Sequence, residues 1–142
     1  MAILLKRAYD PPSRSDGARV LVDRLWPRGI SKDTAKLAAW LRELAPSNEL
    51  RMWFHAHPRQ WTAFRKSYLK ELCDPKAEAS LQQLYDLVDA KKTVTLVYAS
   101  RNLERNNATV LKELLDGMRK PPTSSGPAKA VASAAQRARA RR

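Results

Sequence analysis

The stretch TVTLVYAS, from Thr93 to Ser100, constrains the fold more than any other part of this sequence. It is almost wholly apolar, which is typical of a strand that is covered on both faces. Such strands belong to sheets that carry helices on their two sides. The stretch therefore predicts an α/β protein.

Two more strands are expected upstream, at residues 3–8 and 19–23. The second of these, RVLVD, has apolar residues on both faces and is expected to lie inside the sheet. Residues 9–17 between them hold two prolines and a glycine, which indicates a loop. With the helices described next, the chain predicts a small mixed or parallel sheet with a right-handed crossover, flanked by about four helices in a single domain.

The first helix is expected to begin at Ser31, which suits a helix cap, and to end at Ala45-Pro46. Four apolar residues recur in it at helical spacing, namely Leu37, Trp40, Leu41 and Leu44. The following segment, RMWFHAHP, is ambiguous, and Pro58 is expected to start the second helix.

The remaining helices have clear start signals. Asp74-Pro75 combines a capping side chain with proline at the first helical position, so a third helix should begin there. Asn106 or Asn107 is expected to cap a fourth helix, and Pro121-Pro122 ends the folded part.

The net charge of +13 is unevenly distributed: the C-terminal segment carries a dense block of basic residues, and the rest of the chain is also basic. Residues 121–142 hold five basic and no acidic side chains, which leaves 22 of the 27 basic residues against all 14 acidic ones in residues 1–120. We expect a folded domain over 1–120 and a disordered basic tail over 121–142. Such a charge favours anionic partners, and the tail suits non-specific binding to nucleic acid.

The single cysteine, Cys73, excludes an internal disulfide and is expected to be structural, which fits a reducing cytoplasm. The N-terminus lacks the pattern of a signal peptide, and no apolar run is long enough to cross a bilayer. The sequence predicts a cytoplasmic protein without a membrane partner.

Polar side chains gather where two of the expected strands end. Asp23, Arg24, Trp26 and Arg28 follow the second strand, and Tyr98, Ser100 and Asn106 lie at or beyond the end of the third. If the strands are parallel, these groups share one edge of the sheet, where α/β proteins place their sites. The alternative is that Asp23 pairs with Arg24 or Arg28 and that the turn is only structural.

The two histidines, His55 and His57, are spaced wrongly for two metal ligands on one helix, and we expect neither a metal nor a cofactor. His55 suits a general acid or base, whereas His57 is expected to cap or precede the turn at Pro58. The chain has no phosphate-binding glycine loop and no nucleophile elbow, so the common nucleotide enzymes and hydrolases are not supported.

Several runs together resemble the domain-of-unknown-function 488 (DUF488, YeaO-like) family over about Ile3 to Met118. They are GARVLVDRLWPRGISK, APS followed by LR-x-WFH, W-x-x-F-x-x-x-Y-x-x-EL, VTLVYAS, and N-x-A. The resemblance implies a small cytoplasmic α/β protein of a family whose biochemical activity is not established. The matching positions are Arg7, Asp23, Arg24, Trp26, Pro27, Arg28, Gly29, Pro46, Ser47, Leu50, Arg51, Phe54, His55, Tyr98, Asn106 and Ala108. One departure is Asn107, where family members commonly carry histidine.

These patterns lead to one preferred hypothesis, a protein that binds or acts on a small phosphate-bearing anion. The candidate catalytic residues are Asp23, His55 and Ser100, and the candidate ligand-binding residues are Arg7, Arg24, Trp26, Arg28, Arg51, Tyr98 and Asn106. The alternatives are a nucleic-acid-associated protein that uses its basic body and tail, and a non-catalytic scaffold. Whether the protein is an enzyme, and its oligomeric state, stay open at this point.

Overall fold

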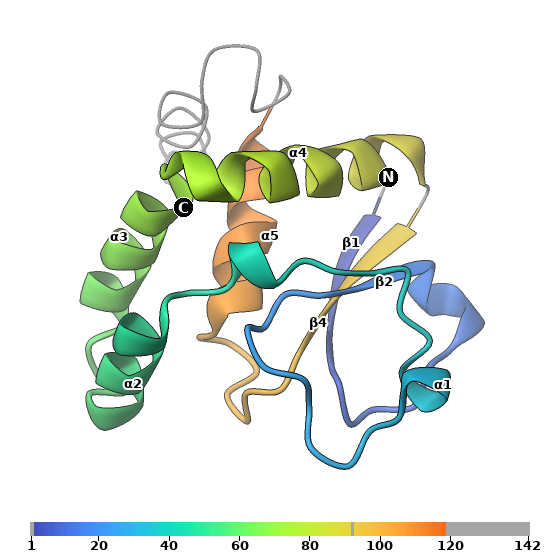
Figure 1. Cartoon of the computed structure of the whole chain (residues 1–142), viewed down its shortest axis with the longest axis horizontal. Helices are drawn as coiled ribbons and strands as arrows, with labels where there is room; N and C mark the ends of the chain where they lie inside the picture. Colours follow the sequence, from blue (N-terminus) through green and yellow to red (C-terminus); the bar gives the residue numbers. More distant parts are fainter. Residues whose placement is uncertain (1, 92, 119–142) are drawn as a thin grey trace.

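The computed structural model describes residues 2–91 and 93–118 (Figure 1). Their sheet has four strands in the order β1-β4-β2-β3, and every pairing is parallel. The strands are β1 (Ala2–Arg7), β2 (Ala18–Leu21), β3 (Ala39–Trp40) and β4 (Thr93–Tyr98). The predicted α/β class is therefore confirmed, with a wholly parallel sheet, and β2 lies inside it, between β4 and β3, as predicted for RVLVD.

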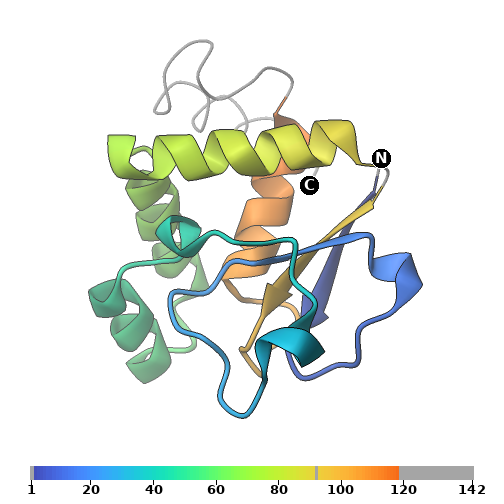
Figure 2. The same ribbon diagram turned by 45° about the vertical axis from the view of Figure 1, so that its right-hand side comes forward.

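The helices pack mainly on one side of the sheet. The described part contains α1 (Lys32–Ala35), α2 (Asn48–Ala56), α3 (Trp61–Leu72), α4 (Pro75–Ala90) and α5 (Asn107–Gly117), with 3-10 turns η1 (Arg14–Asp16) and η2 (Arg42–Leu44). Figures 1 and 2 show α3, α4 and α5 on one side of the sheet and the short α1 on the other. Asp74 and Asn106 cap α4 and α5 as predicted. No helix of the described residues is long and apolar enough to cross a membrane.

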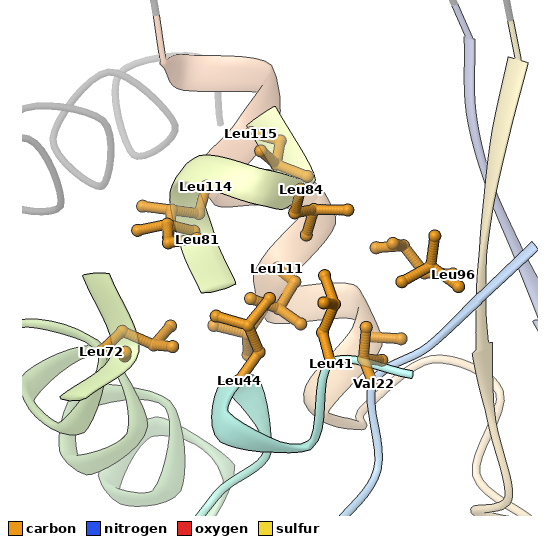
Figure 3. Close-up of a cluster of buried hydrophobic side chains, with 14 of the residues drawn as sticks. Val22, Leu41, Leu44, Leu72, Leu81, Leu84, Leu96, Leu111, Leu114 and Leu115 are labelled. Carbon is orange, nitrogen blue, oxygen red and sulfur yellow. The ribbon is translucent and has the colours of Figure 1, made fainter. Parts of the chain in front are cut away.

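The main core fills the space between the sheet and α3, α4 and α5. Leucines of α4, α5 and η2 converge there with Leu96 of β4 (Figure 3). Side chains alternate along β4, so that Leu96 enters the main core while Val97 enters a smaller cluster on the opposite face. Trp26 and Trp40 cover that second cluster, and a loop therefore replaces a helix layer on this face.

The predicted helix from Ser31 to Ala45 is wrong beyond its first turn. Ser31 does cap α1, but the helix ends at Ala35, and Lys36 adopts a left-handed conformation with φ 49°. Arg19 donates from Nε to the carbonyl of Ala35 at 2.9 Å, and the Ala38 amide donates to the carbonyl of Arg19. Residues 39–40 thus pair with the open edge of β2 and form the short strand β3, which the sequence did not predict. The hydrogen bonds of sheet pairing outweigh the local helical spacing.

Of the ambiguous segment RMWFHAHP, residues 51–56 belong to α2, and His57 caps the end of that helix. This helix begins after Ser47, whose side chain accepts from the Leu50 amide. Pro58 does not start the next helix, since α3 begins at Trp61 after a turn in which Gln60 donates to the carbonyl of His57. The predicted tail, residues 121–142, lies outside the described residues.

Candidate functional site at the carboxyl edge of the sheet

Asp23 occupies the centre of the edge at which the parallel strands end. Its Oδ2 accepts from the backbone amide of Ala99 at 2.8 Å, and its Oδ1 accepts from Nδ2 of Asn107 at 3.0 Å. The same Asn107 nitrogen donates to the carbonyl of Val22 at 2.9 Å. Asp23 therefore ties the end of β2 to the end of β4 and the start of α5. It makes no ion pair with Arg24 or Arg28 among the described residues, so the expected turn-internal pairing is not the one formed.

Burial raises the pKa of the Asp23 carboxyl. The hydrogen bonds from Asn107 and from the Ala99 amide, and the positive charge of Arg51, offset part of this effect. Tyr68 lies nearby and is fully buried, and its hydroxyl donates to the carbonyl of Leu44. Burial holds the Tyr68 pKa well above its usual range, and the charge of Asp23 adds to it. Burial thus shifts the titration of both Asp23 and Tyr68 toward their neutral forms.

Two of the arginines that were predicted to bind an anion donate their hydrogen bonds to backbone carbonyls instead. Arg7 donates from Nε to Ser100 and from Nη2 to Ala99, at 3.0 and 3.1 Å. Arg24 donates from Nε to Pro46 and from Nη2 to Ala45, at 3.3 and 3.2 Å. Both guanidinium groups therefore connect loops that follow different strands.

Trp26 closes the turn VDRLWPRGI upon itself. Its indole nitrogen donates to the carbonyl of Ile30 at 2.6 Å, and its ring meets Trp40 edge to face at 5.4 Å. Trp40 in turn donates to the carbonyl of Asp23 at 2.8 Å. The turn is therefore fixed by its own indole and by a strand that the sequence did not predict.

Tyr98 and Asn106 are buried within the same edge. Asn106 caps α5 by accepting from the Thr109 amide, and its Nδ2 donates to the carbonyl of Asn102 at 2.8 Å. Burial raises the pKa of Tyr98, and the charge of Asp10 adds to this. The geometry gives both side chains a role in holding the loop after β4.

The remaining candidates, Arg28, Arg51, His55 and Ser100, are exposed. The Ser100 hydroxyl accepts from the Asn102 amide at 3.2 Å. No hydrogen bond or ion pair connects Asp23 with His55 or Ser100 in residues 2–91 and 93–118. The structure therefore does not assemble the proposed catalytic group of Asp23, His55 and Ser100.

An open hollow of about 420 Å³ lies beside this edge. Arg24 is the one predicted site residue in its lining, which also contains Ser47, Glu71 and Lys76. Ser47 donates to Glu71 from both its backbone amide and its hydroxyl, at 2.8 and 2.7 Å. With Glu43 and Asp74 also present, carboxylates outnumber cations, so this hollow does not favour an anion. No group of three or more potential metal ligands occurs among the described residues.

The sequence did not reveal the bridging role of Asn107, which is noted there as a possible cap and as a departure from the histidine common in the family. Its position directly after the capping Asn106 was the available signal, because a second buried amide at a helix start requires its own partners. The hydroxyl contact of Tyr68 with the carbonyl of Leu44 joins residues too far apart in the chain to be inferred from the sequence.

Comparison with known proteins gives a consistent family. Residues 2–131 match the family described as "Inactive DUF488-N3 subclade". The uncharacterized protein YeaO of Escherichia coli (strain K12) is 44% identical over 115 residues, covering 81% of this chain and 97% of that protein. The uncharacterized protein Rv3073c of Mycobacterium tuberculosis (strain ATCC 25618 / H37Rv) is 41% identical over 115 residues, covering 81% and 94%. No solved structure matches the chain significantly.

Proposed function

The chain belongs to the DUF488 family, and we propose that it acts as a non-catalytic module that binds a phosphate-bearing small molecule at the carboxyl edge of its sheet. The observation that carries this proposal is the hydrogen bond from Asn107 to Asp23. An amide does not exchange protons in the working pH range, so these two residues cannot act as an acid-base pair. The matched subclade is described as inactive, which supports the same view.

Arg28 and Arg51 support the binding part of the proposal. Both side chains are exposed, and no hydrogen bond engages either guanidinium group among the described residues. Arg7 and Arg24 each use two N–H groups on loop carbonyls and are less available to a ligand. A guanidinium group presents a planar fork that matches phosphate, and the net charge of +13 attracts anions to the surface.

Titration with pyrophosphate and AMP, followed by amide chemical shifts in NMR spectra, tests the binding. The site variant is Arg28→Gln/Arg51→Gln, and the matched control is Lys66→Gln/Lys70→Gln, which removes the same charge from the exposed face of α3. We expect the dissociation constant to rise about tenfold or more in the site variant and less than about twofold in the control, since one lost charged hydrogen bond corresponds to roughly 1.5–3 kcal/mol. Equal losses of affinity in the two variants would show that only the net charge of the protein matters, and would refute the site.

A separate measurement tests the non-catalytic part. We expect no turnover of phosphate esters, nucleotides or nucleosides by the purified protein. A reaction that is abolished by Asp23→Asn but not by the Lys66→Gln/Lys70→Gln control would show that Asp23 is chemically active and would overturn this part alone.

Nucleic-acid binding is the second candidate, favoured by the five basic and no acidic side chains of residues 121–142. Fluorescence anisotropy with a labelled duplex at several salt concentrations tests it. Replacing Lys129, Arg137, Arg139, Arg141 and Arg142 by glutamine should reduce the slope of log K against log salt by about 0.9 for each lost phosphate contact. An unchanged slope would exclude the tail from binding.

A further inference from the structure

A second hollow lies at the opposite, amino-terminal edge of the sheet, away from the strand-end residues discussed above. Its volume is about 540 Å³, and it opens between η1, the first residues of β2 and β4, and the end of α4. Its lining consists of Arg14, Ser15, Gly17, Ala18, Ala38, Lys91 and Thr93. Pockets of this size commonly hold small molecules.

The charge of this lining differs from that of the hollow at the carboxyl edge. Arg14 and Lys91 are cations, and the lining contains no carboxylate among the described residues. Neither side chain has a hydrogen-bond or ion-pair partner in the described part of the chain. Lys91 follows the last residue of α4 and also offsets the negative end of that helix dipole, whereas Arg14 has no such structural role.

The carboxylate of Asp16, which stands in the chain between the lining residues Ser15 and Gly17, is directed into the protein. It pairs with Arg19 at 2.7 Å and with Lys6 at 3.1 Å, and its side chain is 5% exposed. Two cations therefore surround this buried acid, and its charge does not cancel those of Arg14 and Lys91. The field in the hollow remains positive.

The same buried cluster makes the hollow rigid. Ser13 and Asp16 cap the turn η1 reciprocally, and Thr95 donates to the carbonyl of Asp16, which anchors η1 to β4. Gly17 follows with φ 64°, and a Cβ atom there would lie 2.2 Å from the carbonyl oxygen of Thr93. Only glycine permits this close approach, so Arg14 and Ser15 are presented from a fixed turn.

We propose that this hollow binds the phosphate group of a small phosphorylated compound such as a sugar phosphate, without selecting for an aromatic base. Arg14 and Lys91 contact the phosphate, because neither side chain has an ion-pair partner among the described residues that an anion would have to displace. The hydroxyls of Ser15 and Thr93 are placed to meet the hydroxyls of the ligand. No aromatic side chain belongs to the lining, so base stacking contributes nothing and a nucleotide has no advantage over a sugar phosphate.

Titration of the full chain with ribose 5-phosphate, AMP and inorganic pyrophosphate at constant ionic strength tests the proposal by NMR. We expect saturable shifts of the amides of Gly17, Ala18 and Ala38 with ribose 5-phosphate, at an affinity within about threefold of that for AMP. In Arg14→Gln/Lys91→Gln, binding of ribose 5-phosphate should weaken at least tenfold, while Lys66→Gln/Lys70→Gln should change it less than twofold. Ala38→Glu, which places a carboxylate in the hollow, should abolish the shifts.

Three outcomes would overturn the proposal. Shifts that do not saturate would indicate a diffuse charge effect, and shifts confined to the carboxyl edge would assign any binding to Arg28 and Arg51 instead. AMP bound more than tenfold tighter than ribose 5-phosphate at Gly17 would refute the ligand class. Because Arg28→Gln/Arg51→Gln leaves the amino-terminal hollow intact, failure of the carboxyl-edge site and failure of this one are distinguishable.

Discussion

Replacing Gly17 by alanine should destabilise the protein far more than replacing Gly29. Both glycines have positive φ, 64° and 76°, so alanine at either position adopts a backbone conformation that costs roughly 1–2 kcal/mol. At Gly29 nothing lies within 4 Å of the added methyl group, and this backbone cost is the whole effect. Gly29→Ala is therefore the matched control.

At Gly17 a steric overlap adds to the backbone cost. The new Cβ would lie 2.2 Å from the carbonyl oxygen of Thr93 and 2.8 Å from its carbonyl carbon, and both atoms belong to the main chain of β4. The ψ angle of −137° also lies near a region that is almost reserved for glycine, where strain reaches about 3 kcal/mol. We expect a total loss of at least ~3 kcal/mol for Gly17→Ala, against ~1 kcal/mol for Gly29→Ala.

Urea unfolding at 25 °C, followed by tryptophan fluorescence and circular dichroism, measures both free energies of unfolding. If Gly17→Ala does not fold in buffer, both variants are measured in the same high concentration of a stabilising osmolyte. Gly17→Ala should then still unfold at a lower urea concentration than Gly29→Ala. Equal losses in the two variants, or a loss below ~1 kcal/mol at Gly17, would refute the argument that β4 packs tightly against this turn.

Two further predictions concern residues near the same strands. Lys36 has φ 49° and ψ 49°, so Lys36→Gly should raise the free energy of unfolding by ~0.5 kcal/mol in urea titrations. The control Lys32→Gly, inside α1, should lower it by ~1 kcal/mol. A lower free energy of unfolding for Lys36→Gly would contradict the left-handed backbone. Burial alone would raise the pKa of Asp16, but hydrogen bonds from the Ser13 amide, Lys6 and Arg19 outweigh it and hold the pKa below its ordinary 3.8. The folded state therefore gains stability from this carboxylate above pH 3.8 and loses it as the pH falls through the lowered value, so unfolding curves from pH 5 to pH 2 should show a steeper loss in the native chain than in Asp16→Asn.

The parts of the fold that composition determines were predictable. The apolar residues of TVTLVYAS indicate a strand that is buried on both faces, and β4 is one. The Asp74-Pro75 signal marks the start of α4, because a side-chain cap acts within one turn. The segment from residue 36 to 45 was not predictable in this way. Its helical spacing is real, but the free edge of β2 supplies hydrogen-bond partners that no local pattern records.

The candidate site follows the same division. Parallel strands bring the groups after β2 and β4 to one edge, as expected from their order. The partners of each side chain could not be inferred, because Asp23 and Asn107 are separated by 84 residues and meet only once α5 packs. The donor that a sequence reader assigns to a carboxylate is the nearest arginine, whereas a buried amide and a backbone N–H are the donors here.

This difference changes how the signature VDRLWPRG is to be interpreted. Arg24 and Trp26 donate to partly buried loop carbonyls, and the loss of such a donor destabilises the fold by up to roughly 1–3 kcal/mol when the carbonyl stays shielded from water. These structural hydrogen bonds are therefore sufficient to explain why arginine and tryptophan occupy positions 24 and 26. Arg28 has no such partner in the described chain, so a requirement for its charge has to come from something outside the fold. Arg28→Gln should consequently leave the free energy of unfolding unchanged. A loss of anion affinity in this variant would then report a binding role for Arg28 and not a structural one.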